Sequence, residues 1–137
     1  MWAACRNAFR TLTIVPLPGE HAGDLAAALY CFPVVGLVVG GLVAAGAWLF
    51  GGLLAWPAGA GVAGTILALW ITGGLHLDGL GDVADAYAPG RARDRMLAIM
   101  KDHHLGAFGV MAIASLLLVK ACSLARLAAL TQWSWML

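Results

Sequence analysis

A cluster of acidic residues in the middle of the chain carries the strongest chemical signal. Asp78, Asp82 and Asp85 lie at positions i, i+4 and i+7, directly after a long apolar stretch. If the segment Gly74–Asp85 is helical, with 3.6 residues per turn, the carboxylates fall within about 60° of one another on one face. Like charges at this spacing repel each other, and more strongly where the dielectric constant is low. A divalent cation relieves that repulsion, so we predict that all three aspartates bind Mg²⁺ and take part in catalysis on a phosphate-bearing substrate.

A plainer interpretation of the same residues is also open. Asp78 would then cap a helix, while Asp82 and Asp85 would be solvated or would pair with Arg91 and Arg95. The cluster follows an apolar segment, however, and charges at the edge of a membrane span are costly unless they are paired or functional. We therefore favour the metal or substrate role.

A second polar group follows the acidic one. Arg91 and Arg95 suit phosphate because a guanidinium donates two parallel hydrogen bonds, and Lys101 suits it as a point charge. The alternative is that these residues contact lipid headgroups and set the topology. Asp102 is a catalytic candidate that would add a further carboxylate to the metal site. His104 is assigned to phosphate binding. The alternatives are a general acid and a solvated histidine at the membrane interface.

The composition indicates where these residues must be placed. Hydrophobic residues make up 62% of the chain and charged residues only 11%, whereas soluble domains are about 45–50% apolar and about 25% charged. The chain is therefore predicted to be an integral membrane protein, in contact with the lipid bilayer and with no nucleic-acid partner. The N-terminus lacks the pattern of a removable signal peptide.

The apolar segments predict an all-α fold, a polytopic bundle of about three transmembrane helices in a single membrane-embedded domain over residues 1–137. Leu25 to Trp56 holds no charged residue and exceeds the ~20 residues that a helix needs to cross a bilayer. We expect an N-terminal amphipathic helix ending near Pro16. The polar segment between the second and third spans is expected to form a helical catalytic loop. The predicted spans are residues 33–54, 61–75 and 105–124, and the predicted loop is 76–104.

Three features inside or near the spans lead to further expectations. Gly36 and Gly40 match the GxxxG pattern, which predicts tight helix packing. Lys120 lies inside an apolar segment, where we expect it either to snorkel or to face the bundle interior and meet a carboxylate or substrate. The cysteines are odd in number and widely spaced, which predicts packing residues rather than a disulfide or zinc site; they are Cys5, Cys31 and Cys122.

The placement of basic residues predicts the orientation in the membrane. Arg6 and Arg10 precede the first span, no Lys or Arg lies at the turn 56–58, and four lie in the loop 91–101. Because Lys and Arg accumulate in cytoplasmic loops, the N-terminus and the catalytic loop are both predicted to be cytoplasmic.

Four blocks occur in order along the chain: Phe9–Pro18, Phe32–Leu37, Gly74–Asp85 and Met100–Gly109. Together they resemble the cobalamin synthase family, the adenosylcobinamide-GDP ribazoletransferases. The resemblance covers nearly the whole chain, and its His-Leu-Asp-Gly-Leu block is specific. Two positions depart from the family pattern. The opening block of the family usually carries an arginine where this chain has Ile14 and Val15, and many relatives have Ser-Arg or Pro-His where this chain has His103-His104.

The resemblance implies a Mg²⁺-dependent enzyme of a bacterial or archaeal cytoplasmic membrane. It would transfer adenosylcobinamide phosphate from adenosylcobinamide-GDP to α-ribazole or its 5′-phosphate and release GMP, late in cobalamin assembly. The implied ligands are the three aspartates, and phosphate contacts fall to Arg91, Arg95 and Lys101. Family members are about twice as long, so the chain corresponds to an N-terminal half. Whether it acts alone, as a homo-oligomer or with other cobalamin-assembly enzymes is left open.

Two other functions fit the same residues. A CDP-alcohol phosphotransferase also uses clustered helical aspartates and Mg²⁺, but its longer aspartate motif is absent here, since Asp78-Gly-Leu-Gly is followed by Asp82-Val. A non-enzymatic membrane subunit that binds a cation would also use such aspartates. Cation flux distinguishes the subunit from either transferase, which forms a phosphate-bearing product.

Overall fold

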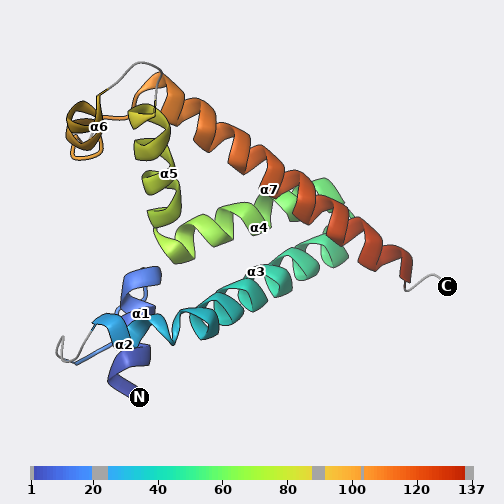
Figure 1. The fold of residues 1–137 in the computed structure, drawn as a ribbon. Coiled ribbons are helices and arrows are strands. Elements are labelled where there is room, and N and C mark those ends of the chain that lie inside the picture. The colour runs from blue at the N-terminus through green and yellow to red at the C-terminus, as the bar shows by residue number, and fades with distance from the viewer. Residues whose placement is uncertain (1, 20–24, 88–91, 103, 135–137) are drawn as a thin grey trace. The chain divides into compact units, whose positions relative to one another are not determined.

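The computed structural model describes residues 2–19, 25–87, 92–102 and 104–134. Every regular element in these ranges is an α-helix, which confirms the predicted all-α class (Figure 1). The helices are α1 (Trp2–Leu12), α2 (Leu25–Leu29), α3 (Phe32–Leu54), α4 (Pro57–Thr72), α5 (Leu75–Ala86), α6 (Arg93–Ile99) and α7 (Ala107–Ser134).

The helices fall into two compact units. One unit comprises residues 1–73 and 121–137, with α1 to α4 and the second half of α7. The other comprises residues 74–120, with α5, α6 and the first half of α7. The acidic cluster and the loop residues singled out from the sequence belong to this second unit.

Two helices, α3 and α7, are long and apolar enough to cross a membrane by themselves. The first, Phe32–Leu54, coincides with the span predicted at 33–54. The second, Ala107–Leu130, extends beyond the predicted end at 124. Helix α4 has 16 residues and qualifies only together with α5, as one broken span. The described residues therefore include two helices long and apolar enough to span a membrane, or three if that pair is one span, which confirms the predicted membrane helix bundle.

The amphipathic N-terminal helix α1 packs against α2 and the start of α3. Ala8, Ala28 and Val35 are the buried centre of this contact. The segment after α1 is held by hydrogen bonds, because the Arg10 guanidinium donates to the Leu17 and Gly19 carbonyls. This helix ends at Leu12, before the predicted end near Pro16.

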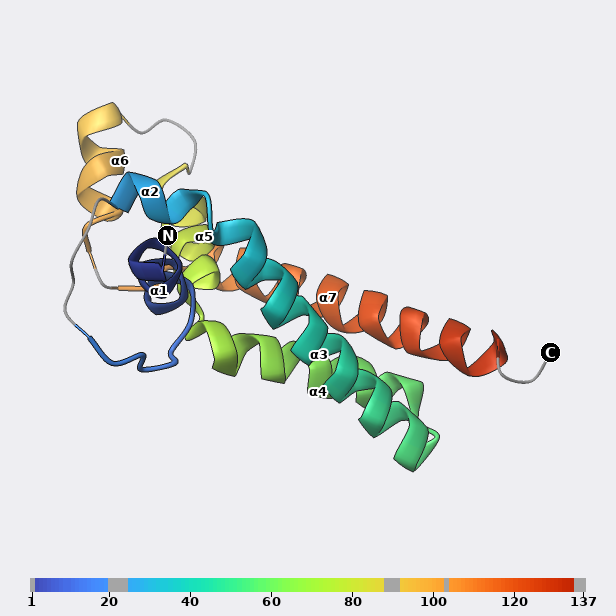
Figure 2. The same cartoon turned by 90° about the horizontal axis from the view of Figure 1, so that it is seen from below.

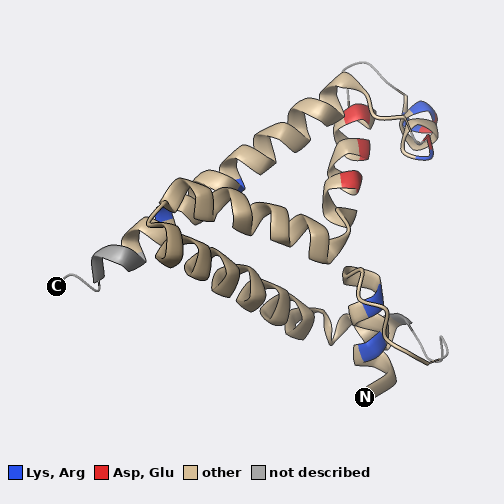
Figure 3. Ribbon diagram, turned by 180° about the vertical axis from the view of Figure 1, so that it is seen from behind, with Lys and Arg blue, Asp and Glu red and all other residues tan. Residues whose placement is uncertain are grey.

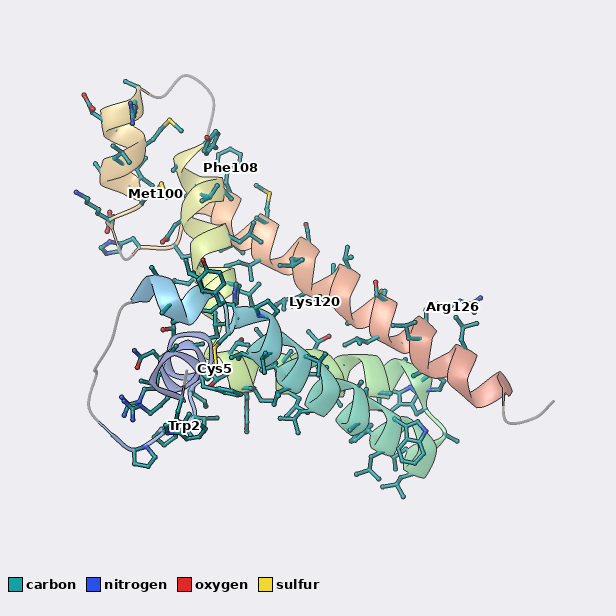
Figure 4. The ribbon with its side chains drawn as sticks, turned by 60° about the horizontal axis from the view of Figure 1, so that its bottom comes forward. Trp2, Cys5, Met100, Phe108, Lys120 and Arg126 are labelled. Atoms are coloured by element: carbon teal, nitrogen blue, oxygen red, sulfur yellow. A yellow bond between two sulfur atoms is a disulfide. The ribbon has the colours of Figure 1, made fainter. Side chains whose placement is uncertain are left out.

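The same packing corrects the prediction for two of the cysteines. Cys5 of α1 and Cys31, which precedes α3, form a disulfide, with Cα atoms 5.2 Å apart (Figure 4). The prediction of simple packing residues failed because 26 positions separate the pair, and only the docking of α1 on α3 brings them together. Cys122 is a free, exposed thiol.

Helices α3 and α4 lie side by side in both views of the ribbon (Figures 1 and 2). Helix α4 comes close to α7 at Gly61, where an added Cβ atom would lie 2.7 Å from the Cβ of Ala125. Gly36 and Gly40 have no neighbour within 4 Å of an added Cβ. The tight packing predicted for that GxxxG pair is therefore made within this chain by a different glycine.

Candidate functional site

Two glycines separate α4 from the acidic helix α5: Gly73 follows the end of α4, and Gly74 precedes the start of α5. Gly73 and Gly74 have φ angles of 62° and 73°, in the left-handed region that glycine adopts without steric cost. The Gly74 carbonyl then accepts hydrogen bonds from the backbone N–H groups of Leu77 and Asp78. These contacts start the new helix one turn before its first carboxylate, so the helix predicted from the aspartate spacing does form.

The three aspartates lie on successive turns of α5 (Figure 3) but in different surroundings. Asp78 is exposed and Asp82 is partly exposed, whereas Asp85 is only 7% exposed. Within the described part of the chain, no hydrogen bond or ion pair engages the carboxylates of Asp78 and Asp82. These two are therefore open to an external cation.

Asp85 is held by the start of α7. Its Oδ2 accepts a hydrogen bond from the Gly106 N–H at 2.7 Å, and its Oδ1 accepts one from the Gly109 N–H at 2.9 Å. Sequence reasoning did not foresee this contact. The pair of glycines at the start of the last apolar segment, with no Ser, Thr, Asn or Asp to cap it, is the signal that was available.

Basic residues lie on the helix next to α5. Helix α6 contacts α5 and exposes Arg93 and Arg95, and Figure 3 shows both helices with their charged positions coloured. Arg91, the other predicted phosphate contact of this segment, lies outside the described residues. The structure therefore places an exposed cationic helix beside the carboxylate-bearing one.

The residues between α6 and α7 form one polar contact of note. The Nδ1 atom of His104 lies 2.5 Å from the Oδ1 atom of Asp102, and the His104 backbone N–H donates to the same oxygen at 3.3 Å. This hydrogen bond, and secondly the negative charge of Asp102, raise the pKa of the His104 imidazole above its usual 6.5. The neighbouring Lys101 is exposed.

The raised pKa bears on the predicted phosphate contact. An isolated histidine is mostly uncharged at neutral pH, which would make it a weak contact for phosphate. Asp102 increases the protonated, cationic fraction of His104 at any pH near neutrality. In this structure Asp102 thus meets His104, and its predicted role as a further metal carboxylate stays a prediction.

Among the residues that the structure describes, no three His, Cys, Asp or Glu side chains converge on a point where they could hold a metal ion together. Mg²⁺ does not require such a cage, because it is commonly bound by one or two carboxylates with waters and substrate phosphates as its other ligands. Asp78 and Asp82, one turn apart and open, fit that requirement.

Lys120 does not find a partner within the described chain. It lies on α7 inside the candidate span Ala107–Leu130 and is exposed, with no hydrogen bond or ion pair to any described residue. The expected contact with a carboxylate is therefore absent from the part of the chain that the structure describes.

Helices of membrane-spanning length are joined to a polar region with open carboxylates and neighbouring cations, and these features define an integral membrane protein. The comparison with known proteins is more specific. The chain belongs to the cobalamin-5-phosphate synthase (CobS) family, whose model matches residues 4–137.

Curated relatives agree with this assignment. The adenosylcobinamide-GDP ribazoletransferase of Chlorobaculum tepidum is 46% identical over 122 residues, which is 89% of this chain and 48% of the relative. The enzyme of the same name from Chlorobium phaeobacteroides is 41% identical over 129 residues, 94% of this chain and 52% of the relative. The enzyme of the same name from Herpetosiphon aurantiacus is 46% identical over 119 residues, which is 83% of this chain and 47% of the relative. The chain spans about half the length of the curated relatives it matches. No solved structure matches it significantly.

Proposed function

We propose that the chain carries the metal- and phosphate-binding part of an adenosylcobinamide-GDP ribazoletransferase. The observation that carries the proposal is the open pair Asp78 and Asp82 on α5, next to the cationic helix α6, in a chain of the cobalamin-5-phosphate synthase family. Relatives bearing the name of this enzyme give the substrate class.

The proposed reaction is a displacement at a pyrophosphate. A ribose hydroxyl that is free in both α-ribazole and its 5′-phosphate, and so is not the 5′-hydroxyl, attacks the phosphorus on the corrinoid side of adenosylcobinamide-GDP. A P–O bond forms to the ribazole, the pyrophosphate P–O bond breaks, the hydroxyl loses its proton and GMP leaves. Such a reaction depends on positioning of the two substrates and on neutralising the charge that develops on the leaving phosphate.

Different residues of this unit would bind the metal ion and the phosphate groups. Asp78 and Asp82 would hold Mg²⁺, which when bound supplies positive charge to the leaving phosphate oxygens. Arg95 and Lys101 are exposed cations in the same unit and would hold the non-reacting phosphate oxygens, with His104 as a third donor in its protonated form. Together they orient a pyrophosphate, and the predicted contact at Arg91 belongs to the same proposal.

The site is proposed to face the cytoplasm, where nucleotides are made. The support is the excess of Lys and Arg before the first span and in the loop 91–101, with none at the turn 56–58.

Binding of the corrinoid substrate tests the metal site directly. The chain in proteoliposomes is mixed with adenosylcobinamide-GDP, and co-sedimented corrinoid is read from its visible absorbance, with Mg²⁺ or with EDTA. Asp82→Asn is compared with Asp94→Asn, an isosteric change of an exposed carboxylate on α6. We expect Mg²⁺-dependent binding that Asp82→Asn weakens at least about tenfold and Asp94→Asn leaves unchanged, since a lost ligand contact to charge is worth about 1.5–3 kcal/mol. Binding that is indifferent to EDTA and to Asp82→Asn contradicts the proposal.

A further inference from the structure

Asp85 has surroundings unlike those of the other two aspartates on α5. We propose that Asp85 is not a metal ligand but the N-terminal cap of α7, a positioning residue that fixes the acidic face of α5 and leaves the cation to Asp78 and Asp82. The metal part of this inference rests on the proposed function, whereas the capping part does not.

The hydrogen bonds of Asp85 cap the start of α7, although Asp85 lies 21 and 24 residues before the two residues that it caps. Gly106 is the residue before α7 and Gly109 is its third residue, and their N–H groups are two of those that a helix start leaves without a partner. In a capping box, two side chains of the helix itself satisfy these two positions. Here a single carboxylate on another helix satisfies both, one with each oxygen.

Glycine at both positions is what allows the carboxylate to come this close. A Cβ atom at Gly106 would overlap Asp85, with the carboxyl carbon 2.8 Å away, and one at Gly109 would overlap the Asp85 Oδ2 atom. Neither glycine has a positive φ angle. Their absent side chains are therefore explained by the space that Asp85 occupies and not by backbone conformation.

The contact also sets how closely α5 and α7 approach. A Cβ atom at Gly109 would lie 3.0 Å from the Gly81 carbonyl oxygen, and one at Gly81 would lie 3.0 Å from Leu105 and 3.1 Å from Ile113. The two backbones thus approach each other at Gly81, one turn before Asp85 on α5, and at Gly109, which Asp85 itself contacts. Since side chains at i and i+4 share a face, fixing Asp85 and Gly81 against α7 fixes where the remaining face of α5 points.

The charge of Asp85 suits this role. The first turn of α7 has no acidic residue, so the partial positive charge of the helix start is met by Asp85 alone among the carboxylates of α5. Mg²⁺ demands near-octahedral oxygen ligands and keeps several waters. A carboxylate that is 7% exposed, with each oxygen already bonded to a backbone N–H, gives such an ion little access.

Hydrogen exchange of the Gly109 amide in detergent micelles tests the cap. Asp85→Asn removes the charge and presents an NH₂ group to one of the two donors, while Asp82→Asn makes the same change one turn earlier. We expect Asp85→Asn to speed exchange at Gly109 by about 10-fold to about 150-fold, the loss of one hydrogen bond to a charged acceptor. We expect Asp82→Asn to leave that rate unchanged.

Binding of Mn²⁺, used as a paramagnetic substitute for Mg²⁺ and followed by electron paramagnetic resonance, tests the metal part. We expect Asp82→Asn to weaken Mn²⁺ binding at least about tenfold and Asp85→Asn to alter it less than about threefold. Loss of Mn²⁺ binding in Asp85→Asn with unchanged exchange at Gly109 would overturn the inference. If the wild-type chain binds no Mn²⁺, the proposed function fails while the exchange result still decides whether Asp85 is a cap.

A second variant covers the case in which Asp85→Asn does not fold. Gly106→Ala keeps the carboxylate but pushes it away from the helix start, so the cap predicts faster exchange at Gly109. Gly79→Ala is the matched control, because an added Cβ there has no neighbour within 4 Å. Equal exchange in the two alanine variants overturns the inference.

Discussion

Replacing Gly61 by alanine should separate the contact between α4 and α7 from the intrinsic effect of the substitution. A Cβ atom at this position would overlap the Ala121 carbonyl oxygen and lie 2.7 Å from both the backbone nitrogen and the Cβ of Ala125. Two of these neighbours are backbone atoms, so no rotamer change relieves the overlap and the helices must separate.

The matched variant is Gly40→Ala on α3, where an added Cβ has no neighbour within 4 Å. Both substitutions gain about 0.5–1 kcal/mol because alanine favours a helix over glycine. Only Gly61→Ala adds an overpacking cost of about 1–3 kcal/mol, and contact with backbone places it at the upper end. The free energy of unfolding should therefore differ by about 2–3 kcal/mol between the two variants.

Reversible unfolding in mixed micelles, with increasing sodium dodecyl sulfate and helix content as the signal, measures this difference. Gly61→Ala should unfold at a lower denaturant fraction than wild type, and Gly40→Ala at the same fraction or a higher one. Equal stability of the two variants would refute the close contact of α4 with α7 and the role of Gly61 in it.

Two further predictions concern groups outside the acidic helix. Cys5→Ser should lower the free energy of unfolding by about 3 kcal/mol, because the Cys5–Cys31 disulfide closes a loop with a sequence separation of 26. Thermal unfolding with and without reductant measures this loss. If reductant still lowered the stability of the variant, the prediction would be contradicted. The His104 imidazole should titrate above pH 6.5 by NMR, and Asp102→Asn should bring the midpoint back toward 6.5. Because the pKa of His104 is raised in the folded state, the Asp102–His104 contact contributes its full stabilisation below about pH 6.5, and this stabilisation is lost as the pH rises through the raised pKa. An unchanged titration midpoint in Asp102→Asn would argue against the contact.

The sequence predicted those features that depend on local patterns. The uncharged run after residue 25 marks the span of α3, and the i, i+4, i+7 spacing of the aspartates marks the helix α5. Periodicity does not report which residues on a face are covered, however. It therefore grouped Asp85 with Asp78 and Asp82, although only Asp85 is buried, against the start of α7.

The features that sequence reasoning missed depend on contacts between distant segments. The Cys5–Cys31 pair requires α1 to dock on α3. The GxxxG pair at Gly36 and Gly40 satisfies a local rule for helix packing, yet the close contact within this chain falls at Gly61. A short motif shows that a helix can be approached closely, but the partner helix decides where the approach occurs.

Product formation tests the central claim most directly, that the acidic face of α5 serves ribazole transfer. The chain is assayed in proteoliposomes with adenosylcobinamide-GDP, α-ribazole and Mg²⁺, alone and together with the half of the Chlorobaculum tepidum relative that it does not cover. We expect cobalamin and GMP to form in equal amounts, EDTA to abolish both, and Asp82→Asn to lower the rate at least about tenfold while Asp94→Asn does not. No product from the wild-type chain even with the added half, or product that survives EDTA and Asp82→Asn, would contradict a role of α5 in this reaction.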